Sequence, residues 1–384
     1  MDTQGRSDAI EQCSFPVMRH IVPGVEMLGS YQPGKSPQEV LHEFGVHDAI
    51  KLASNENSLG PSSSAIEAFK QASHELARYP DGHACGLREA LAVHYGIERE
   101  RILTGHGSNE LFELTARVLL RPGDNVVVSR HAFVMYELVS TAAGAEVRAA
   151  PSRDHSDAMP LGHDPDSMFA LIDARTRVVF IANPNNPTGT WLSEKELLAF
   201  LERVPPSVLV VVDEAYAEYA TVPGFGSALR WLNRFPNLLI TRTFSKAYGL
   251  AALRIGYGIG HPDLMERFDR ARQPFNLNMP AQKAALAALA DTDHLERSIH
   301  QNSEQKNFML EQLGRLSIQS LPSAANFLSI FLDDSERVYE YLMQSGVIVR
   351  SLKSYGLVDY LRVTIGLAEE NERFLHALQQ AIQT

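Results

Sequence analysis

The chain has 384 residues, of which 45% are hydrophobic and 21% are charged, a balance typical of a globular protein with about two or three domains. Its formal net charge of −11 argues against broad binding to nucleic acid, which needs a basic surface, but it is compatible with a small anionic substrate. Two cysteines cannot form a disulfide framework, no apolar run approaches the roughly 18 residues of a membrane span, and the first residues lack a signal-peptide core, so we expect a cytoplasmic protein.

Short apolar strands followed by loops and helical patterns recur in the first three quarters of the chain. The runs of valine, leucine and isoleucine are continuous, as expected for strands that helices cover on both faces. Segments 110–120 and 281–290 have helical apolar spacing. The pattern predicts an α/β fold with a mostly parallel sheet, and its strands are expected at 125–129, 178–182, 208–212 and 238–241.

A second unit is predicted to follow the sheet. A polar helical pattern at 295–313 leads into further elements at 327–331, 336–344, 347–349 and 370–382. We therefore predict a large α/β domain at 50–290 and a smaller α+β domain at 291–384. The N-terminal segment, 1–49, is expected to pack on the smaller domain.

The strongest chemical indication is Lys246, which follows Ser245 directly. Thr243 lies three residues before this lysine and Arg254 lies eight residues after it. A lysine that attacks an aldehyde must be partly desolvated and close to a fixed anion. The two hydroxyl groups and the arginine are suited to hold a phosphate. The combination indicates a lysine that binds pyridoxal phosphate, and the alternative interpretation is an ordinary lysine at a helix edge.

Two of the predicted strands end in polar residues, at the position where open α/β sheets bind ligands. Asp213 follows 208–212 and is placed to keep the pyridine nitrogen of the cofactor protonated, although a helix cap is the alternative. Asn186 lies in the loop N-P-N-N-P-T-G after 178–182 and is placed to donate to the phenolate oxygen of the cofactor. Tyr216 is a second candidate donor, and a purely structural turn is the alternative for the loop.

Two further segments offer contacts to a flat, phosphorylated ligand. Gly107, Ser108 and Asn109 precede the predicted helix at 110–120, and the free N–H groups of a helix N-terminus bind phosphate. Phe133 follows a predicted strand and is placed to stack on a planar ring. A phenylalanine of the core is the equal alternative.

Arg350 and Arg362 each lie beside an apolar strand near the C-terminus. Arginines in such positions bind planar or tetrahedral anions through paired hydrogen bonds. Salt bridges to carboxylates at a domain interface are the alternative. The histidines show no pair at metal-ligand spacing with a third partner, so we predict no metal site.

A family resemblance rests on six residues in a fixed order: Asn186, Asp213, Tyr216, Lys246, Arg254 and Arg362. This set resembles the fold-type I aminotransferases, and the surrounding motifs are similar to those of histidinol-phosphate aminotransferases. Supporting motifs are L-A-S-N-E-N at 52–57, R-Y-P-D-G at 78–82 and L-R-V-T-I-G-L at 361–367. The likeness extends from about residue 22 to the end of the chain.

The resemblance implies a fold-type I homodimer with active sites at the subunit interface. It implies that Tyr79 reaches the cofactor phosphate bound by the partner subunit and that Tyr31 lines the substrate pocket. Asn55, within the first supporting motif, is expected at the substrate site as well. Ser58 and Ser351 stand where many relatives carry proline.

The resemblance further implies transamination of histidinol phosphate with 2-oxoglutarate, giving imidazole acetol phosphate and glutamate. Lys246 would move the proton at the substrate Cα, and Arg350 and Arg362 would accept a phosphate or a carboxylate. An aromatic amino acid aminotransferase is the nearest alternative, followed by a decarboxylase of a phosphorylated amino acid. A cofactor-sensing regulatory module or a catalytically silent variant is disfavoured, because no DNA-binding segment is added and the lysine with its supporting groups is present.

Overall fold

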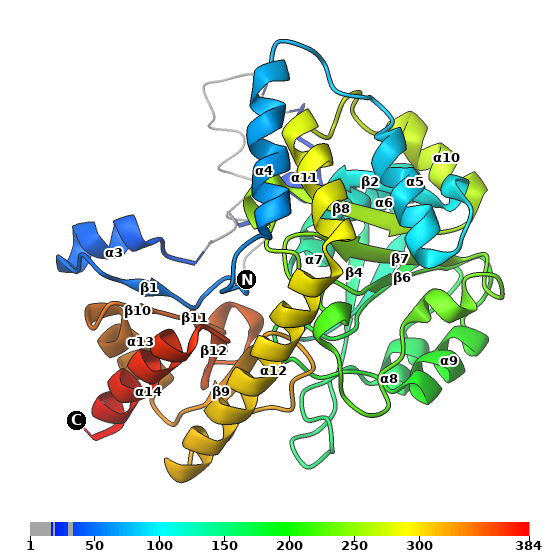
Figure 1. The fold of residues 1–384 in the computed structure, drawn as a ribbon. Helices are drawn as coiled ribbons and strands as arrows, with labels where there is room; N and C mark the ends of the chain where they lie inside the picture. Colours follow the sequence, from blue (N-terminus) through cyan, green and yellow to red (C-terminus); the bar gives the residue numbers. More distant parts are fainter. Residues whose placement is uncertain (1–16, 18–19, 30–33, 384) are drawn as a thin grey trace.

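The structure, a computed structural model, describes residues 17, 20–29 and 34–383. Its largest element is a seven-stranded sheet with the strand order β2-β8-β7-β6-β5-β3-β4 (Figure 1). Of these strands, β8 alone runs antiparallel to its neighbours, so the predicted mostly parallel sheet is confirmed. The strands are β2 (Ile102–His106), β3 (Asn125–Ser129), β4 (Glu146–Ala150), β5 (Thr176–Ala182), β6 (Leu209–Asp213), β7 (Leu238–Thr243) and β8 (Ile255–Ile259).

Side chains of the central strands alternate between two apolar cores, one on each face of the sheet. In β5, Val179 and Ile181 join one core while Val178 and Phe180 join the other. This division explains why the strands are apolar at every position rather than at every second one. Helices α5 (Cys85–Tyr95), α9 (Glu194–Arg203) and α11 (Met279–Ala290) supply the first core, and α6 (Ser108–Leu119), α7 (Met135–Ala142) and α10 (Pro262–Ala271) supply the second.

The C-terminal part of the chain forms a smaller sheet with helices of its own. Its antiparallel sheet has the order β11-β12-β9. A long helix, α12 (Thr292–Arg315), runs from the large sheet layer to this part (Figure 1). The other elements are β9 (Phe327–Phe331), α13 (Ser335–Gln344), β10 (Val347–Ile348), β11 (Arg350–Ser351), β12 (Tyr360–Thr364) and α14 (Ala368–Gln383). Within the described residues, no helix combines the length and apolar character needed to cross a membrane.

The N-terminal segment contacts both parts of the molecule. Strand β1 (Ile50–Lys51) pairs in parallel with β10, and α3 (Pro37–Phe44) lies against α13. The short helix α2 (Pro23–Glu26) instead lies against α7, where Gly24 is so close to the carbonyl oxygen of Thr141 that a side chain would not fit. The division of the chain at residues 50 and 290 stays a prediction. Helices α4 (Ser63–Ala72) and α8 (Pro165–Ala170) complete the large layer.

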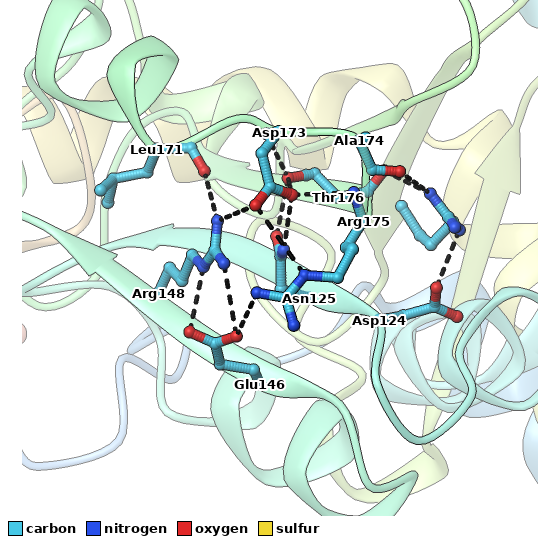
Figure 2. A network of polar contacts seen from close by, with 10 residues as sticks. Asp124, Asn125, Glu146, Arg148, Leu171, Asp173, Ala174, Arg175 and Thr176 are labelled. Atoms are coloured by element: carbon cyan, nitrogen blue, oxygen red, sulfur yellow. Dashed lines mark hydrogen bonds and ion pairs between the residues drawn. The ribbon is translucent and has the colours of Figure 1, made fainter.

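Strand β4 forms one edge of the large sheet and is held by a polar network, shown in Figure 2. Arg148 of β4 donates to Glu146 at 3.0 Å and to Asp173 at 2.8 Å. Asp173 also accepts from the buried Asn125 at 2.9 Å, and these hydrogen bonds, with that from Asn125 first, lower the pKa of Asp173. Because β4 carries charged and half-exposed residues, its sequence does not show the apolar run that marks the central strands.

Replacement of Asn125 by alanine tests how strongly this edge depends on the network. Asn125 is fully buried, donates to Asp173 and accepts from Thr176 at 2.7 Å, so Asn125→Ala removes both of these bonds from the network. We expect the free energy of unfolding, measured by urea denaturation, to fall by about 1–3 kcal/mol. Arg175→Ala, which removes an exposed ion pair with Glu146, should cost less than about 1 kcal/mol. Equal losses in the two variants would contradict a structural role for the buried network.

Candidate active site

One cavity lies at the carboxyl ends of β5, β6 and β7, where β11 and β12 of the smaller sheet close it. The residues predicted from the sequence that line this cavity are Asn55, Ser108, Asn109, Phe133, Asn186, Asp213, Tyr216, Thr243, Ser245, Lys246, Arg254, Arg350 and Arg362. Gly107 lies directly behind Arg254, and Tyr79 lies on the surface. Tyr31 is outside the described residues. The convergence of segments separated by more than 300 residues identifies this cavity as the candidate active site.

Lys246 follows β7 on a turn at the floor of the cavity. Its Nζ atom donates to the carbonyl oxygen of Ser54 at 3.0 Å and lies 5.7 Å from the centre of the Tyr216 ring. Desolvation, and then the positive charge of Arg362, lowers the pKa of Lys246 to about 7. At neutral pH a large share of this amine is therefore uncharged and able to attack an electrophilic carbon.

Asp213 ends β6 at the same edge of the sheet. The hydroxyl group of Tyr136 donates to Oδ2 at 2.7 Å, and that of Thr241 donates to Oδ1 at 3.0 Å. Burial raises the pKa of Asp213 to about 6 in spite of these two hydrogen bonds. A positively charged group bound beside this carboxyl would favour its ionised form, which is the environment that a protonated pyridine nitrogen needs.

Tyr136 was not found from the sequence, although it holds Asp213 in place. It is fully buried on α7, stacks on Phe180 with ring centroids 4.8 Å apart, and meets the edge of Phe112 at 5.0 Å. A tyrosine with such neighbours has the sequence pattern of an ordinary core residue. The structure shows its polar end only because β6 brings Asp213 next to it.

The opposite end of the cavity is suited to an anion. Helix α6 begins at Ser108 without a side-chain cap, and Ser108 and Asn109 of its first turn line the cavity. Arg254 donates to the hydroxyl of Ser245 at 3.3 Å, and a Cβ atom on Gly107 would come within 2.6 Å of its guanidinium group. Gly256 allows β8 to lie close to the start of α6, since a Cβ there would lie 2.3 Å from the amide nitrogen of Ser108.

Thr243 contributes to this end by shaping the turn. Its hydroxyl donates to the carbonyl oxygen of Ile255 at 3.1 Å and accepts from the amide of Ser245 at 3.1 Å. The turn therefore presents the hydroxyl of Ser245 and the amine of Lys246 to the same space. A phosphate held by Ser108, Ser245 and Arg254 would receive the charge-assisted hydrogen bonds that such groups form.

Asn186 and Tyr216 both line the cavity, and each accepts a hydrogen bond from a neighbouring side chain. The Oδ1 atom of Asn186 accepts from Arg362, which leaves its amide nitrogen as the group that can donate to a bound oxygen. The hydroxyl of Tyr216 accepts from Asn55 at 2.9 Å, and desolvation raises the pKa of Tyr216 to about 12. Tyr216 therefore stays a neutral phenol whose hydrogen is available for donation.

Two arginines of the smaller sheet reach the cavity together. Arg350 of β11 and Arg362 of β12 are register partners in an antiparallel pair, so their side chains leave the same face of the sheet. Arg362 is buried, donates to the carbonyl oxygen of Ala53 at 2.8 Å, and lies 5.2 Å from the centre of the Phe327 ring. The pair offers two guanidinium groups to one anion.

The arrangement fits pyridoxal phosphate, the cofactor that the sequence predicts. The anion end suits its phosphate, and the buried carboxyl of Asp213 suits its ring nitrogen. The depressed pKa of Lys246 suits a covalent bond to its aldehyde carbon. Phe133 lines the cavity at the carboxyl end of β3, as expected for a residue that covers a flat ring.

Comparisons with known proteins agree with this geometry. A family model described as "Aminotransferase class I and II" matches residues 47–378. The chain is 46% identical over 361 residues to histidinol-phosphate aminotransferase 1 of Nitrosococcus oceani, covering 94% of this chain and 96% of the relative. It is also 46% identical over 363 residues to histidinol-phosphate aminotransferase 2 of Pseudomonas fluorescens, with 94% and 96% covered. Among solved structures, histidinol-phosphate aminotransferase of Sinorhizobium meliloti in complex with pyridoxal 5′-phosphate has a TM-score of 0.85, 27% identity and coverage of 94% and 97%.

Replacement of Asp213 by asparagine tests the electrostatics of the buried carboxyl. Because its pKa in the folded protein, about 6, lies above the ordinary value of 3.8, Asp213 stabilises the fold below pH 4, and this stabilisation is lost as the pH rises through 6. We expect Asp213→Asn, freed of bound small molecules, to be more stable than the wild type at pH 8 by about 1–3 kcal/mol. Denaturant unfolding at pH 4 and pH 8 measures the difference. A variant that is less stable than the wild type at both pH 4 and pH 8 would show that the buried, ionised carboxylate does not destabilise the fold.

Proposed function

Since the chain belongs to the class I and II aminotransferases, we propose that it transfers the amino group of histidinol phosphate to 2-oxoglutarate with pyridoxal phosphate as cofactor. The proposal is supported by curated relatives of that activity at 46% identity over nearly the whole chain. It is supported equally by a cavity whose groups fit the cofactor at one end and an anionic substrate at the other.

Pyridoxal phosphate, when bound, supplies an electrophilic carbon and an electron sink for the negative charge that forms at the substrate Cα. Lys246 would hold it covalently until the amino substrate takes over that bond. The Nζ atom of Lys246, uncharged in a large share of molecules at neutral pH, is then free to take the proton from the substrate Cα. The same amine later returns a proton, so that one group serves as base and acid.

The other cavity residues act by orientation and charge. Asp213 would hold a proton on the ring nitrogen, and Tyr136 and Thr241 keep its carboxyl in the required direction. Asn186 and Tyr216 would donate to the phenolate oxygen, because both have a donor group on the cavity side. Hydrogen bonds within the protein hold these side chains in place, which favours a preorganised site.

The single observation that carries the substrate assignment is the register pair of Arg350 and Arg362. Histidinol phosphate has a phosphate and no carboxylate, whereas glutamate has two carboxylates. Guanidinium groups bind either anion by donating paired hydrogen bonds, so one pocket can receive both substrates in turn. An aromatic amino acid aminotransferase with the same acceptor would also bind two carboxylates, so the phosphate is the group that distinguishes the two amino substrates.

A spectral half-reaction tests the assignment. Mixing the cofactor-loaded protein with histidinol phosphate alone should convert the absorbance of the lysine-bound cofactor to that of its amine form at micromolar substrate. Phenylalanine should require far higher concentrations, because it lacks the phosphate that the two arginines bind. Lys246→Ala should retain the cofactor but lose at least about 10²- to 10⁴-fold in rate, as it lacks the base.

The outcomes separate the remaining assignments. Conversion by phenylalanine but not by histidinol phosphate would move the function to aromatic transamination. Release of carbon dioxide without a keto product from a phosphorylated amino acid would indicate the decarboxylase. Unchanged turnover in Lys246→Ala would contradict the mechanism for every substrate.

We also propose that two copies of the chain share their active sites. Tyr79 is 82% exposed, stacks on Phe275 with ring centroids 4.6 Å apart, and does not line the cavity of its own chain. Leu76 beside it is 67% exposed. An exposed aromatic pair next to an exposed leucine is typical of a surface that another subunit covers. A symmetric dimer through this patch would bring Tyr79 to the phosphate end of the partner's site.

Mixed dimers test this arrangement. Protomers carrying Lys246→Ala and protomers carrying Tyr79→Ala should each be poorly active alone. If Tyr79 acts on the partner's site, a hybrid of the two variants contains one intact site, and a random mixture recovers about a quarter of the wild-type activity. Refolding the variants together and separately, followed by rate measurements, gives the comparison. A mixture no more active than the separate variants would place Tyr79 outside the partner's site.

A further inference from the structure

One wall of the cavity comes from a short turn rather than from either sheet. The 3-10 turn η7 (Lys353–Tyr355) follows β11, and Tyr355 lines the cavity. Tyr355 is half-buried and packs against the apolar cluster that contains Leu352 and Leu357. Its phenol group is close enough to Tyr216 to contribute to the raised pKa of that residue. Tyr355 therefore forms part of the cavity wall near Tyr216.

His131 fixes this turn from the large sheet layer. Its Nδ1 atom lies 2.8 Å from the carbonyl oxygen of Tyr355, and since a carbonyl can only accept, Nδ1 carries the hydrogen. His131 is buried, and desolvation lowers its pKa, which favours the neutral ring. The carbonyl oxygen of His131 accepts in turn from Asn185 at 2.8 Å. The turn is thus tied to the loop that carries Asn186.

The aromatic residues that line the cavity come from two different sides of it. Phe133 and Tyr216 belong to the elements that surround the predicted cofactor, at the ends of β3 and β6. Tyr355 belongs to the segment that carries Arg350, which is the side predicted to bind the substrate anion. A substrate whose phosphate lies near Arg350 would share this side of the cavity with Tyr355.

We propose that Tyr355 determines substrate choice by a hydrogen bond between its phenol hydroxyl and a ring nitrogen of an imidazole-bearing amino substrate. This inference rests on the proposed function and deepens it. An imidazole that enters a desolvated pocket loses hydrogen bonds to water at both nitrogens, so a positioned partner recovers part of that loss. A phenyl ring has no ring nitrogen, so the hydroxyl of Tyr355 cannot form this hydrogen bond with it.

Tyr355→Phe removes the hydroxyl and keeps the ring. In the spectral half-reaction of the cofactor-loaded protein, the ratio of maximum rate to apparent dissociation constant for histidinol phosphate should fall roughly five- to tenfold. The same ratio for phenylalanine should stay within about twofold. Tyr360→Phe is the matched control, because Tyr360 lies in the same apolar cluster but does not line the cavity, and both ratios should stay at the wild-type level.

His131 is a positioning residue, and a pair of variants tests that role. His131→Ala removes the donor to Tyr355 and should raise the apparent dissociation constant for histidinol phosphate while the maximum rate changes little. His131→Asn places an amide nitrogen near the position of Nδ1 and should restore most of the affinity. Cofactor absorbance should be the same in both variants.

The results separate this inference from the proposed function. If the wild type does not convert histidinol phosphate, the proposed function fails and the role of Tyr355 fails with it. If the wild type converts it but Tyr355→Phe is unchanged, or loses equally for both substrates, the role of Tyr355 alone is overturned. A selective loss for histidinol phosphate supports both.

Discussion

The closure of the active site depends on one buried guanidinium group, that of Arg362. From β12 it donates to Asn186, in the loop after β5, and to the carbonyl oxygen of Ala53, just after β1. A buried arginine is strongly unfavourable unless its donors are satisfied, so these contacts fix three segments that are far apart in the sequence. The same group faces the cavity, and the orientation of the anion site is therefore set before any substrate enters.

The charge distribution around this group explains the unusual ionisation of its neighbours. Arg362 and Arg254 both lower the pKa of Lys246, while the carboxyl of Asp213, which lines the same cavity, acts in the opposite direction. A chain with a formal net charge of −11 thus has a local concentration of positive charge in its candidate active-site cavity. Such a site attracts phosphorylated and carboxylated molecules, and an uncharged lysine is the form compatible with two arginines nearby.

The sequence was sufficient to locate those site residues that directly follow an apolar strand. Asp213 and Lys246 each follow an apolar run, and parallel strands necessarily bring such positions to one edge of the sheet. The mostly parallel sheet was predicted correctly from these apolar runs, the cofactor from the groups around Lys246, and the family from the resemblance of its ordered motifs. Tyr136 and His131 escaped notice because their polar partners lie far away in the sequence, and a buried tyrosine or histidine has no local pattern that separates it from the core. Strand β4 was missed because it lies at the sheet edge and carries charges.

The loop after β5 links the two halves of the site physically. Asn186 meets Arg362 of the smaller sheet, while Asn185, one residue earlier, donates to the carbonyl oxygen of His131. His131 in turn holds the turn that contains Tyr355. A displacement of this loop would therefore change the positions of Asn186, Arg362 and the turn at Tyr355 together. Because buried hydrogen bonds are made with little freedom to adjust, the proposed roles of Asn186 in cofactor binding and of Tyr355 in substrate choice would be coupled through the same few side chains.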